Sequence, residues 1–178
     1  RLYSNIVWGM RGNYFTAPTD CPQRDERLGW TGDTQIFAGA AAYLADIRSF
    51  MHKWLGDARD SQQGFDGAYC DVIPRCFTGN NGNAAWGDAC LIVPNKLYEM
   101  YNDTEILREH FDSMEYYMQY LEQFGLEGPN TAYGDWLNYD VTDKRYIAVA
   151  YYAYDASLMK KFCEILGKPE RAAHYAEL

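Results

Sequence analysis

Apolar residues recur at helical spacing along most of this chain, and polar stretches rich in glycine, proline and asparagine separate the periodic segments. The clearest stripe follows Asp103, where the apolar positions are Leu107, Phe111, Met114, Tyr117, Met118 and Leu121. Similar periodicity predicts helices over residues 2–14, 31–44, 46–64, 85–101 and 144–166, with a further helix from residue 170. No stretch favours a strand, so the pattern predicts an all-α fold.

The connections between these helices are of two kinds. Residues 65–84 and 125–142 form long polar segments, whereas Asn102-Asp103 and Gly167-Lys168-Pro169 are tight turns. Long loops inside a compact domain are usually functional. The alternation predicts helical hairpins whose long loops gather at one end, and the sequence contains no fixed-period repeat.

Length and charge narrow the class of protein. The chain has 178 residues, which suits one domain, and a net charge of −9, which argues against binding the phosphates of a nucleic acid. No stretch approaches the roughly 20 apolar residues that a membrane span requires, so no membrane association is expected. The chain opens on Arg1 without a methionine and stops at Leu178 within a predicted helix. We therefore expect a fragment of a longer protein, whose localisation the sequence leaves unknown.

Cysteine and histidine do not form a ligand pattern. The five cysteines lack paired spacing, and the three histidines, His52, His110 and His174, are scattered. The sequence therefore predicts neither a disulfide framework nor a metal site, and most thiols are expected to be small buried groups.

Residues 19–33, which we call the acidic loop, read T-D-C-P-Q-R-D-E-R-L-G-W-T-G-D and are the strongest candidate for a functional site. They hold four carboxylates, two arginines, a tryptophan and two glycines. Pro18 and Pro22 flank Asp20 and keep the chain off the helical path. A loop this dense in carboxylates beside an aromatic ring is more typical of a site than of a connection.

Glu26 lies between Asp20 and Asp33 and is a candidate proton donor. Cleavage of a glycosidic bond needs one carboxyl group that stays protonated and donates to the leaving oxygen. Neighbouring carboxylates and the Trp30 indole favour that form of Glu26, whereas arginines pointing inward oppose it. Asp33, at a helix start, is expected to stay ionised. The alternative is a solvated acidic loop in which Asp33 is only a helix-end charge.

Trp86 and Trp136 each lie at a loop–helix junction beside a glycine and an aspartate. Sugar rings pack on indoles while neighbouring carboxylates bind their hydroxyl groups, so both tryptophans are candidate sugar contacts. Burial of both in the core is an equal alternative, and Asp88 and Asp135 equally suit helix caps. A further aromatic set recurs at helical spacing and is assigned to the core, comprising Tyr146, Tyr151, Tyr152 and Tyr154.

The acidic loop closely resembles the signature of bacterial α-L-rhamnosidases of glycoside hydrolase family 78. The later pieces W-G-D-A, from Trp86, and Y-G-D-W-L, from Tyr133, match that family in order and approximate spacing, and the resemblance covers essentially the whole chain. It implies an (α/α)6 barrel, a toroid of six helical hairpins, in a catalytic domain. The implied reaction is hydrolysis of terminal α-L-rhamnosyl bonds with inversion.

The resemblance also implies roles for individual residues. Glu26 matches the general acid, and the implied substrate-binding residues are Asp20, Asp33, Trp30, Trp86 and Trp136. No metal or other cofactor is implied. The family's general base is a glutamate late in the barrel, and no part of this chain matches that region. About seven of the twelve barrel helices are predicted here, so residues 1–178 are expected to be roughly the first half of the catalytic domain, truncated on its C-terminal side.

Two other functions remain open. One is an (α/α)6 glycosidase for a different sugar, and the other is a non-catalytic helical module that binds carbohydrate or serves as a scaffold. The expected partner of an enzyme is a carbohydrate, and in a rhamnosidase it is a rhamnosyl glycan or glycoside. Because the general base is expected beyond Leu178, the chain alone is expected to be inactive. Because a half barrel exposes apolar faces, the chain is also expected to associate with itself or to be insoluble.

Overall fold

The structure of the chain, a computed structural model, describes residues 1–76, 81–125 and 131–178. The helices in these ranges are α1 (Leu2–Asn13), α2 (Thr31–Leu44), α3 (Arg48–Ser61), α4 (Ala89–Tyr101), α5 (Thr104–Glu122), α6 (Lys144–Ile165) and α7 (Pro169–Glu177). The β-type pairings within the same ranges are isolated bridges, so the predicted all-α class is confirmed. The predicted loops 65–84 and 125–142 lie partly outside the described residues.

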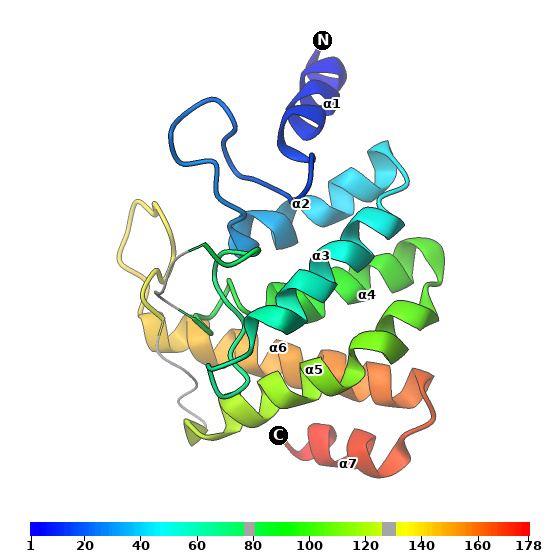
Figure 1. Cartoon of the computed structure of the whole chain (residues 1–178). Helices are drawn as coiled ribbons and strands as arrows, with labels where there is room; N and C mark the ends of the chain where they lie inside the picture. Colours follow the sequence, from blue (N-terminus) through cyan, green and yellow to red (C-terminus); the bar gives the residue numbers. More distant parts are fainter. Residues whose placement is uncertain (77–80, 126–130) are drawn as a thin grey trace.

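The helices pair as antiparallel hairpins, α2 with α3, α4 with α5 and α6 with α7 (Figure 1). Helices α2, α4 and α6 begin at one end of the molecule, which we call the loop end because the long connections between hairpins gather there. The short connections within the hairpins lie at the opposite end, the turn end. In the view of Figure 1, α3 and α5 lie in front of α4 and α6.

Helix α4 is the centre of the core because it packs against α2, α3, α5 and α6. Its residues from Ala89 to Asn95 are all buried, as expected of a helix that is apolar on every side. The apolar stripe predicted from the sequence of α5 is buried from Leu107 to Leu121, and Trp54 of α3 is completely inaccessible. The periodicity of the α5 sequence therefore identified the buried face of that helix correctly.

Side-chain caps fix the turn end. Asp103 caps α5, because its Oδ1 accepts the Ile106 N–H at 3.1 Å. Asn102 ends α4 in the left-handed conformation, with φ of +54°. Helix α3 begins at Arg48, later than the predicted residue 46, because Asp46 lies outside the helix and accepts the Arg48 N–H with its carboxylate.

Helix α4 also begins later than predicted, at Ala89 instead of residue 85. The residues before it form a turn in which Ala85 has φ of +72°, a left-handed conformation that a right-handed helix does not admit. The Asp88 carboxylate accepts the Ala85 N–H and holds this turn. The turn sets the direction of Trp86 at the loop end.

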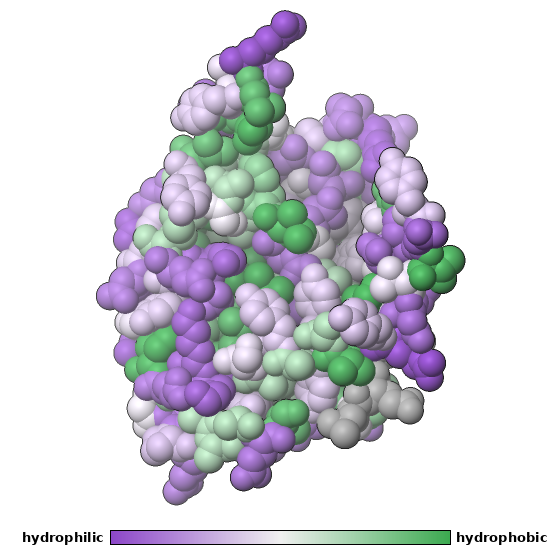
Figure 2. Space-filling model, turned by 180° about the vertical axis from the view of Figure 1, so that it is seen from behind, coloured by the Kyte–Doolittle hydropathy of each residue, from purple (hydrophilic) through white to green (hydrophobic). Residues whose placement is uncertain are grey.

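Large apolar side chains remain exposed on helices α1, α2 and α6. They include Leu2, Trp8, Ile36, Tyr43 and Tyr146. Figure 2, the view from behind, shows apolar and weakly polar side chains spread among polar ones over a face that is hollowed near its centre. Exposed apolar area of this kind is typical of a surface that another part of a protein covers. None of the described helices has the length and apolar character to span a membrane.

Candidate active site

A pocket of about 760 Å³ opens at the loop end, a size suited to a small ligand. It is lined by α1 and the residues after it, by the first turns of α2, by the turn before α4 and by residues 134–151. Four of the residues expected to bind substrate line it, namely Asp20, Asp33, Trp86 and Trp136, and Asp135 lines it as well. Glu26 and Trp30, which are also among the described residues, do not line this pocket. They lie beside it in the acidic loop.

Backbone hydrogen bonds tie the acidic loop to a neighbouring loop. The Thr31 N–H donates to the Asp71 carbonyl at 2.9 Å, and the Ile73 N–H donates to the Gly29 carbonyl at 2.9 Å. Gly29 is required at this contact, because a Cβ there would lie 2.1 Å from the Ile73 carbonyl oxygen. These bonds anchor the end of the acidic loop that leads into α2.

Arg24 gathers three side chains at the tip of the acidic loop. Its guanidinium lies 2.7 Å from a Glu26 oxygen and 3.5 Å from an Asp20 oxygen, and its Nε donates to the Cys21 Sγ at 2.9 Å. Asp20, Cys21 and Glu26 offer atoms that could ligate a metal ion and lie within 4.8 Å of one another. The guanidinium is already the cation of this group, so we interpret it as an ion-pair cluster.

The second oxygen of Glu26 accepts a hydrogen bond from the Trp30 indole N–H at 2.6 Å. Of the two arginines that could oppose protonation of Glu26, Arg24 points inward, whereas Arg27 faces Asp25 at 3.9 Å. The two contacts occupy both oxygens of Glu26. Direct contact of a substrate with the second oxygen therefore requires Arg24 to move away, and the Arg24 side chain is 61% exposed.

Asp33 lies in the first turn of α2 and faces the pocket. Burial raises its pKa, and the negative charges of Asp20 and Glu26 raise it further, while a backbone N–H lowers it. The start of α2 therefore favours the ionised form of Asp33, as expected. Its effect on the pKa is smaller than that of burial and of the neighbouring negative charges. A ligand that donates hydroxyl hydrogen bonds to these carboxylates would relieve their repulsion.

Tyr133 joins the three tryptophans, although its sequence context gave it no role of its own. Its ring centroid lies 4.3 Å from that of Trp86, 5.9 Å from that of Trp30 and 6.0 Å from that of Trp136. The contacts with Trp30 and Trp136 are edge-on, the arrangement that aromatic quadrupoles favour. The only signal in the sequence was its place in the Y-G-D-W-L piece.

The two tryptophans of the pocket differ in burial. Trp136 is 63% exposed, so the alternative that it is a core residue is wrong. Trp86 is 8% exposed and still contributes to the pocket lining. It packs over the first turn of α2, where a Cβ on Gly32 would lie 2.9 Å from its indole. Gly32 therefore sets how closely Trp86 approaches the helix that carries Asp33.

The assignment of four α6 tyrosines to the core is only partly correct. Tyr152 is buried, and Tyr154 is 39% exposed. Tyr146, which is 74% exposed, and Tyr151 both line the pocket. The helical spacing located the helix correctly, but it did not reveal that the first turns of α6 pass the pocket.

Asp71 and Asn83 form a buried polar link between loops that no sequence motif indicated. The Asn83 amide donates to the Asp71 carboxylate at 2.6 Å, and the Asn83 Oδ1 accepts the Ala132 N–H at 2.6 Å. Burial raises the pKa of Asp71 to about 7, although hydrogen bonds from Asn83 and Tyr133 oppose the shift. Asp71 thus connects the loops that carry Trp86 and Tyr133 through its carboxyl group, and the loop that carries Trp30 through its backbone carbonyl.

Asp88 and Asp155 form a second buried pair beneath the Trp86 turn. Asp88 accepts a hydrogen bond from the Tyr117 hydroxyl at 3.0 Å and does not cap α4 with its side chain. Burial raises the pKa of both carboxyl groups, and the charge of Asp88 raises that of Asp155 further. No donor among the described residues reaches the Asp155 oxygens, so a proton shared with Asp88 accounts for the pair.

The whole chain, residues 1–178, matches the protein family described as the bacterial alpha-L-rhamnosidase 6 hairpin glycosidase domain. An alpha-L-rhamnosidase of Streptomyces avermitilis is 48% identical over 181 positions, covering 100% of this chain and 17% of the relative. One from Formosa agariphila is 38% identical over 188 positions, covering 100% of this chain and 20% of the relative. The chain therefore spans about a fifth of the length of these relatives.

Solved structures agree with these matches. The crystal structure of Streptomyces avermitilis alpha-L-rhamnosidase complexed with L-rhamnose superimposes with a TM-score of 0.93 and 47% identity, over 99% of this chain and 17% of that one. The alpha-L-rhamnosidase from Dictyoglumus thermophilum gives a TM-score of 0.89 and 34% identity, over 97% of this chain and 20% of that one. The helical arrangement of this chain is thus that of a segment of these proteins.

Proposed function

The chain belongs to the bacterial α-L-rhamnosidase six-hairpin glycosidase family, and from this membership we propose that it forms part of the catalytic domain of an α-L-rhamnosidase. The full-length protein would release terminal α-L-rhamnose from glycosides or glycans. Residues 1–178 would supply about the first half of the (α/α)6 barrel, with the later hairpins provided by further sequence. The substrate is a carbohydrate, and the proposed reaction requires no metal or other cofactor.

One observation carries this proposal. The pocket at the loop end combines the carboxylates of Asp20, Asp33 and Asp135 with the indoles of Trp86 and Trp136, and Glu26 lies beside it in the acidic loop. Carboxylates that accept hydroxyl hydrogen bonds and indoles that pack against sugar C–H groups are the complementary surface for a monosaccharide ring. We propose that Asp20 and Asp33 bind rhamnose hydroxyls, that Trp86 and Trp136 wall the ring, and that Trp30 completes the wall from the acidic loop.

We propose Glu26 as the general acid that protonates the leaving oxygen. In the arrangement described here its carboxylate is paired with Arg24 and hydrogen-bonded to Trp30. Binding of the substrate beside Glu26 would displace the exposed Arg24 side chain and free the Glu26 oxygen that it contacts. Trp30 would then hold one oxygen of Glu26 and leave the other directed to the substrate.

The general base is proposed to lie outside this chain. An inverting glycosidase needs two carboxyl groups about 6.5–9.5 Å apart on opposite faces of the sugar, with a water molecule on the side of the base. Asp20, Asp25 and Asp33 share the acidic loop and the adjoining helix start with Glu26, so they belong to the same wall. A later hairpin of the barrel would provide the opposite wall and the base.

The proposal is tested by assaying the full-length protein on a panel of nitrophenyl glycosides that differ only in the sugar. Cleavage of the α-L-rhamnoside in preference to the others, with β-L-rhamnose as the first product seen by NMR, is the expected result. Preferred cleavage of another sugar would favour a different (α/α)6 glycosidase. Binding of rhamnose without cleavage of any substrate would favour a non-catalytic module.

A further inference from the structure

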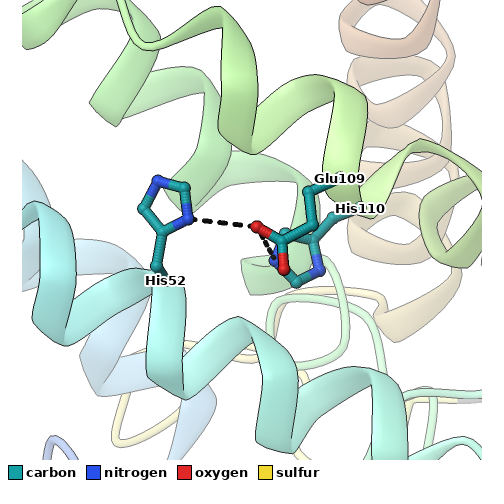
Figure 3. Close-up of side chains that lie close together, drawn as sticks. All are labelled: His52, Glu109 and His110. Carbon is teal, nitrogen blue, oxygen red and sulfur yellow. Dashed lines mark hydrogen bonds and ion pairs between the residues drawn. The ribbon is translucent and has the colours of Figure 1, made fainter.

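A second group of polar side chains lies between α3 and α5, away from the pocket (Figure 3). His52 belongs to α3, and Glu109 and His110 belong to α5. Each offers one atom that could ligate a metal ion, and these atoms lie within 4.8 Å of one another. The histidines are scattered in the sequence, but hairpin packing brings two of them together in space.

His110 supplies the strongest indication that this group has a function. The residue is 1% exposed, and no hydrogen-bond partner for its Nε2 is found in the described part of the chain. This atom lies 3.9 Å from a Glu109 oxygen, beyond hydrogen-bond distance, and Figure 3 shows the two side chains side by side. A buried imidazole nitrogen without a hydrogen-bond partner is available to a bound cation.

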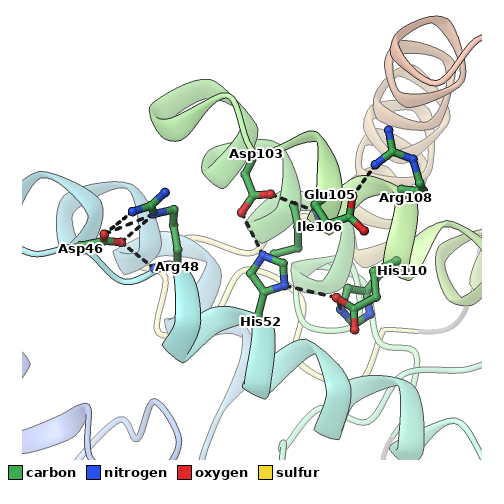
Figure 4. A network of polar contacts seen from close by, with 9 residues as sticks. Asp46, Arg48, His52, Asp103, Glu105, Ile106, Arg108 and His110 are labelled. Carbon is green, nitrogen blue, oxygen red and sulfur yellow. Dashed lines mark hydrogen bonds and ion pairs between the residues drawn. The ribbon is translucent and has the colours of Figure 1, made fainter.

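His52 is oriented by two carboxylates from α5 and the residue before it. Its Nε2 lies 2.9 Å from an Asp103 oxygen, and its Nδ1 lies 3.3 Å from a Glu109 oxygen (Figures 3 and 4). A neutral imidazole that donates its Nε2–H to Asp103 has a lone pair on Nδ1. That lone pair then faces the lone pairs of Glu109, and only a second proton or a cation between them makes the contact favourable.

The acidic loop shows what a comparable group looks like when the protein supplies its own cation. There, the Arg24 guanidinium contacts Asp20 and Glu26 directly. Between α3 and α5, no Lys or Arg among the described residues forms an ion pair with Glu109 or Asp103. Arg59, on α3, makes no ion pair with this group in the same part of the chain.

We propose that His52, Glu109 and His110 bind a divalent transition-metal ion of the zinc class, which joins α3 to α5. The proposed ligands are His52 Nδ1, a Glu109 carboxylate oxygen and His110 Nε2, with water at the remaining position. Two histidines and a carboxylate are an established ligand set for Zn²⁺, and tetrahedral ligands at zinc are about 3.4 Å apart. The separations of 3.3 and 3.9 Å from Glu109 to the two rings are close to this value.

Asp103 would act as the outer partner of the metal site. A metal-binding histidine usually donates its other ring N–H to a carboxylate, which fixes the tautomer and the ring orientation. Asp103 accepts from His52 Nε2 and also caps α5 (Figure 4). None of the three proposed ligands lines the pocket, so the ion would stabilise the hairpin packing and take no part in glycoside cleavage.

The test uses the full-length protein, stripped with a chelator and then titrated with Zn²⁺. Bound zinc is counted by atomic absorption, and the melting temperature is measured with and without the ion. We expect one zinc ion fewer per molecule in Glu109→Gln and in His52→Gln, and loss of most of the zinc-dependent rise in melting temperature. Asp103→Asn preserves the cap and is expected to weaken zinc binding by roughly 10- to 100-fold.

His174→Gln is the matched control, because His174 Nε2 contacts Glu122 at 3.0 Å in a histidine–glutamate pair without a third ligand. It should leave the zinc content and the zinc-dependent stabilisation unchanged. Co²⁺ substituted for zinc should give visible absorption that Glu109→Gln removes. Equal zinc content in the wild-type protein and in both ligand variants would overturn the proposal and assign the contact to a doubly protonated His52. An equal loss in His174→Gln would overturn it as well, because the zinc would then be bound non-specifically.

Discussion

The two ends of the helical hairpins treat their charged groups in opposite ways. At the turn end, Asp46 is hydrogen-bonded by the Arg48 side chain and backbone, which lowers its pKa to about 2. Asp103 is partly buried, which opposes ionisation, but hydrogen bonds from His52 and the Ile106 N–H lower its pKa overall. Both of these carboxylates have a donor that favours their charge, and Asp103 also caps α5 (Figure 4).

At the loop end, carboxyl groups are buried near one another. Burial is the largest cause of the raised pKa of Asp33, Asp71, Asp88 and Asp155. Carboxyl groups whose surroundings make ionisation unfavourable cluster at functional sites. Proton transfer and substrate binding can use the free energy that is released when these surroundings change. The comparison indicates that the turn end serves stability and the loop end serves chemistry.

The largest effect that the comparison predicts is on the chain taken alone. Residues 1–178 contain the proposed acid wall but not the opposite wall, so the isolated chain should have no measurable rhamnosidase activity. Its exposed apolar side chains, such as Trp8, Ile36 and Tyr43, should also make it associate. Activity assays with an activated rhamnoside and light scattering test both expectations. A monomer that turns over like an enzyme would mean that the base lies within this chain.

Trp54 in the core and Trp136 in the pocket should respond differently to replacement by alanine. Trp54→Ala removes a fully buried side chain and should cost about 3–5 kcal/mol of stability. Trp136→Ala removes a side chain that is 63% exposed, so the melting temperature should change little while rhamnose binding weakens. Thermal melts beside rhamnose titrations of the full-length protein measure the two effects. A large loss of stability in Trp136→Ala without a binding defect would contradict the difference expected between the two tryptophans.

The two ends should also respond to pH with opposite sign. Asp71 has a pKa of about 7 in the folded state, above its unfolded value, so its contribution is fully present below about pH 4 and is lost as the pH rises through 7. The loss is on the order of 4 kcal/mol at about 1.4 kcal/mol per pKa unit. Asp46 has a folded pKa of about 2, so its contribution is present above about pH 4 and is lost as the pH falls through 2.

Melting temperatures of the full-length protein measured from pH 2 to pH 8 test this. Asp71→Asn should flatten the decline between about pH 4 and pH 7, whereas Asp46→Asn should flatten only the acid side. The slope is the readout, because Asn at position 71 also changes the hydrogen bonds with Asn83. An unchanged slope in Asp71→Asn would assign the pH dependence to other groups.

Two glycine substitutions, one in α3 and one in the acidic loop, should have opposite effects, and the substitution in α3 has the smallest effect predicted here. Gly56 lies in α3, and no atom lies within 4 Å of the position that a Cβ would take there, so Gly56→Ala should stabilise the helix by up to about 1 kcal/mol. Gly29→Ala should destabilise the protein and lower activity, because the new Cβ would collide with the Ile73 carbonyl. Melting temperature and turnover of the two variants check this, and a neutral Gly29→Ala would contradict the rigid attachment of the acidic loop.

The sequence predicted the helices well because their apolar stripes are local. Helix α2 has the bounds that its pattern indicated, and the α5 stripe is the buried one. Boundaries shifted where one residue decided the outcome, as at Ala85, whose left-handed conformation delays α4. The acidic loop and the tryptophans were recognised from motifs that lie within single segments.

The contacts between segments could not be predicted. Asp88 and Asp155, and His52 and Glu109, are pairs that helix packing brings together, whereas Asp71 and Asn83 meet within the connection between α3 and α4. An isolated aspartate or histidine in a sequence gives no sign of the residue it will face, and its burial is equally invisible. These tertiary contacts therefore appear only in the structure.

The central claim is that Glu26 donates the proton to the leaving group, and Glu26→Gln in the full-length protein tests it most directly. The amide keeps the shape of the side chain but has no transferable proton, so turnover of an alkyl rhamnoside should fall by roughly 10² to 10⁴. A dinitrophenyl rhamnoside, whose leaving group needs little protonation, should lose far less. Asp25→Asn, at a fully exposed carboxylate of the same loop, is the control and should affect neither substrate. Equal losses on the two rhamnosides in Glu26→Gln would contradict the assignment.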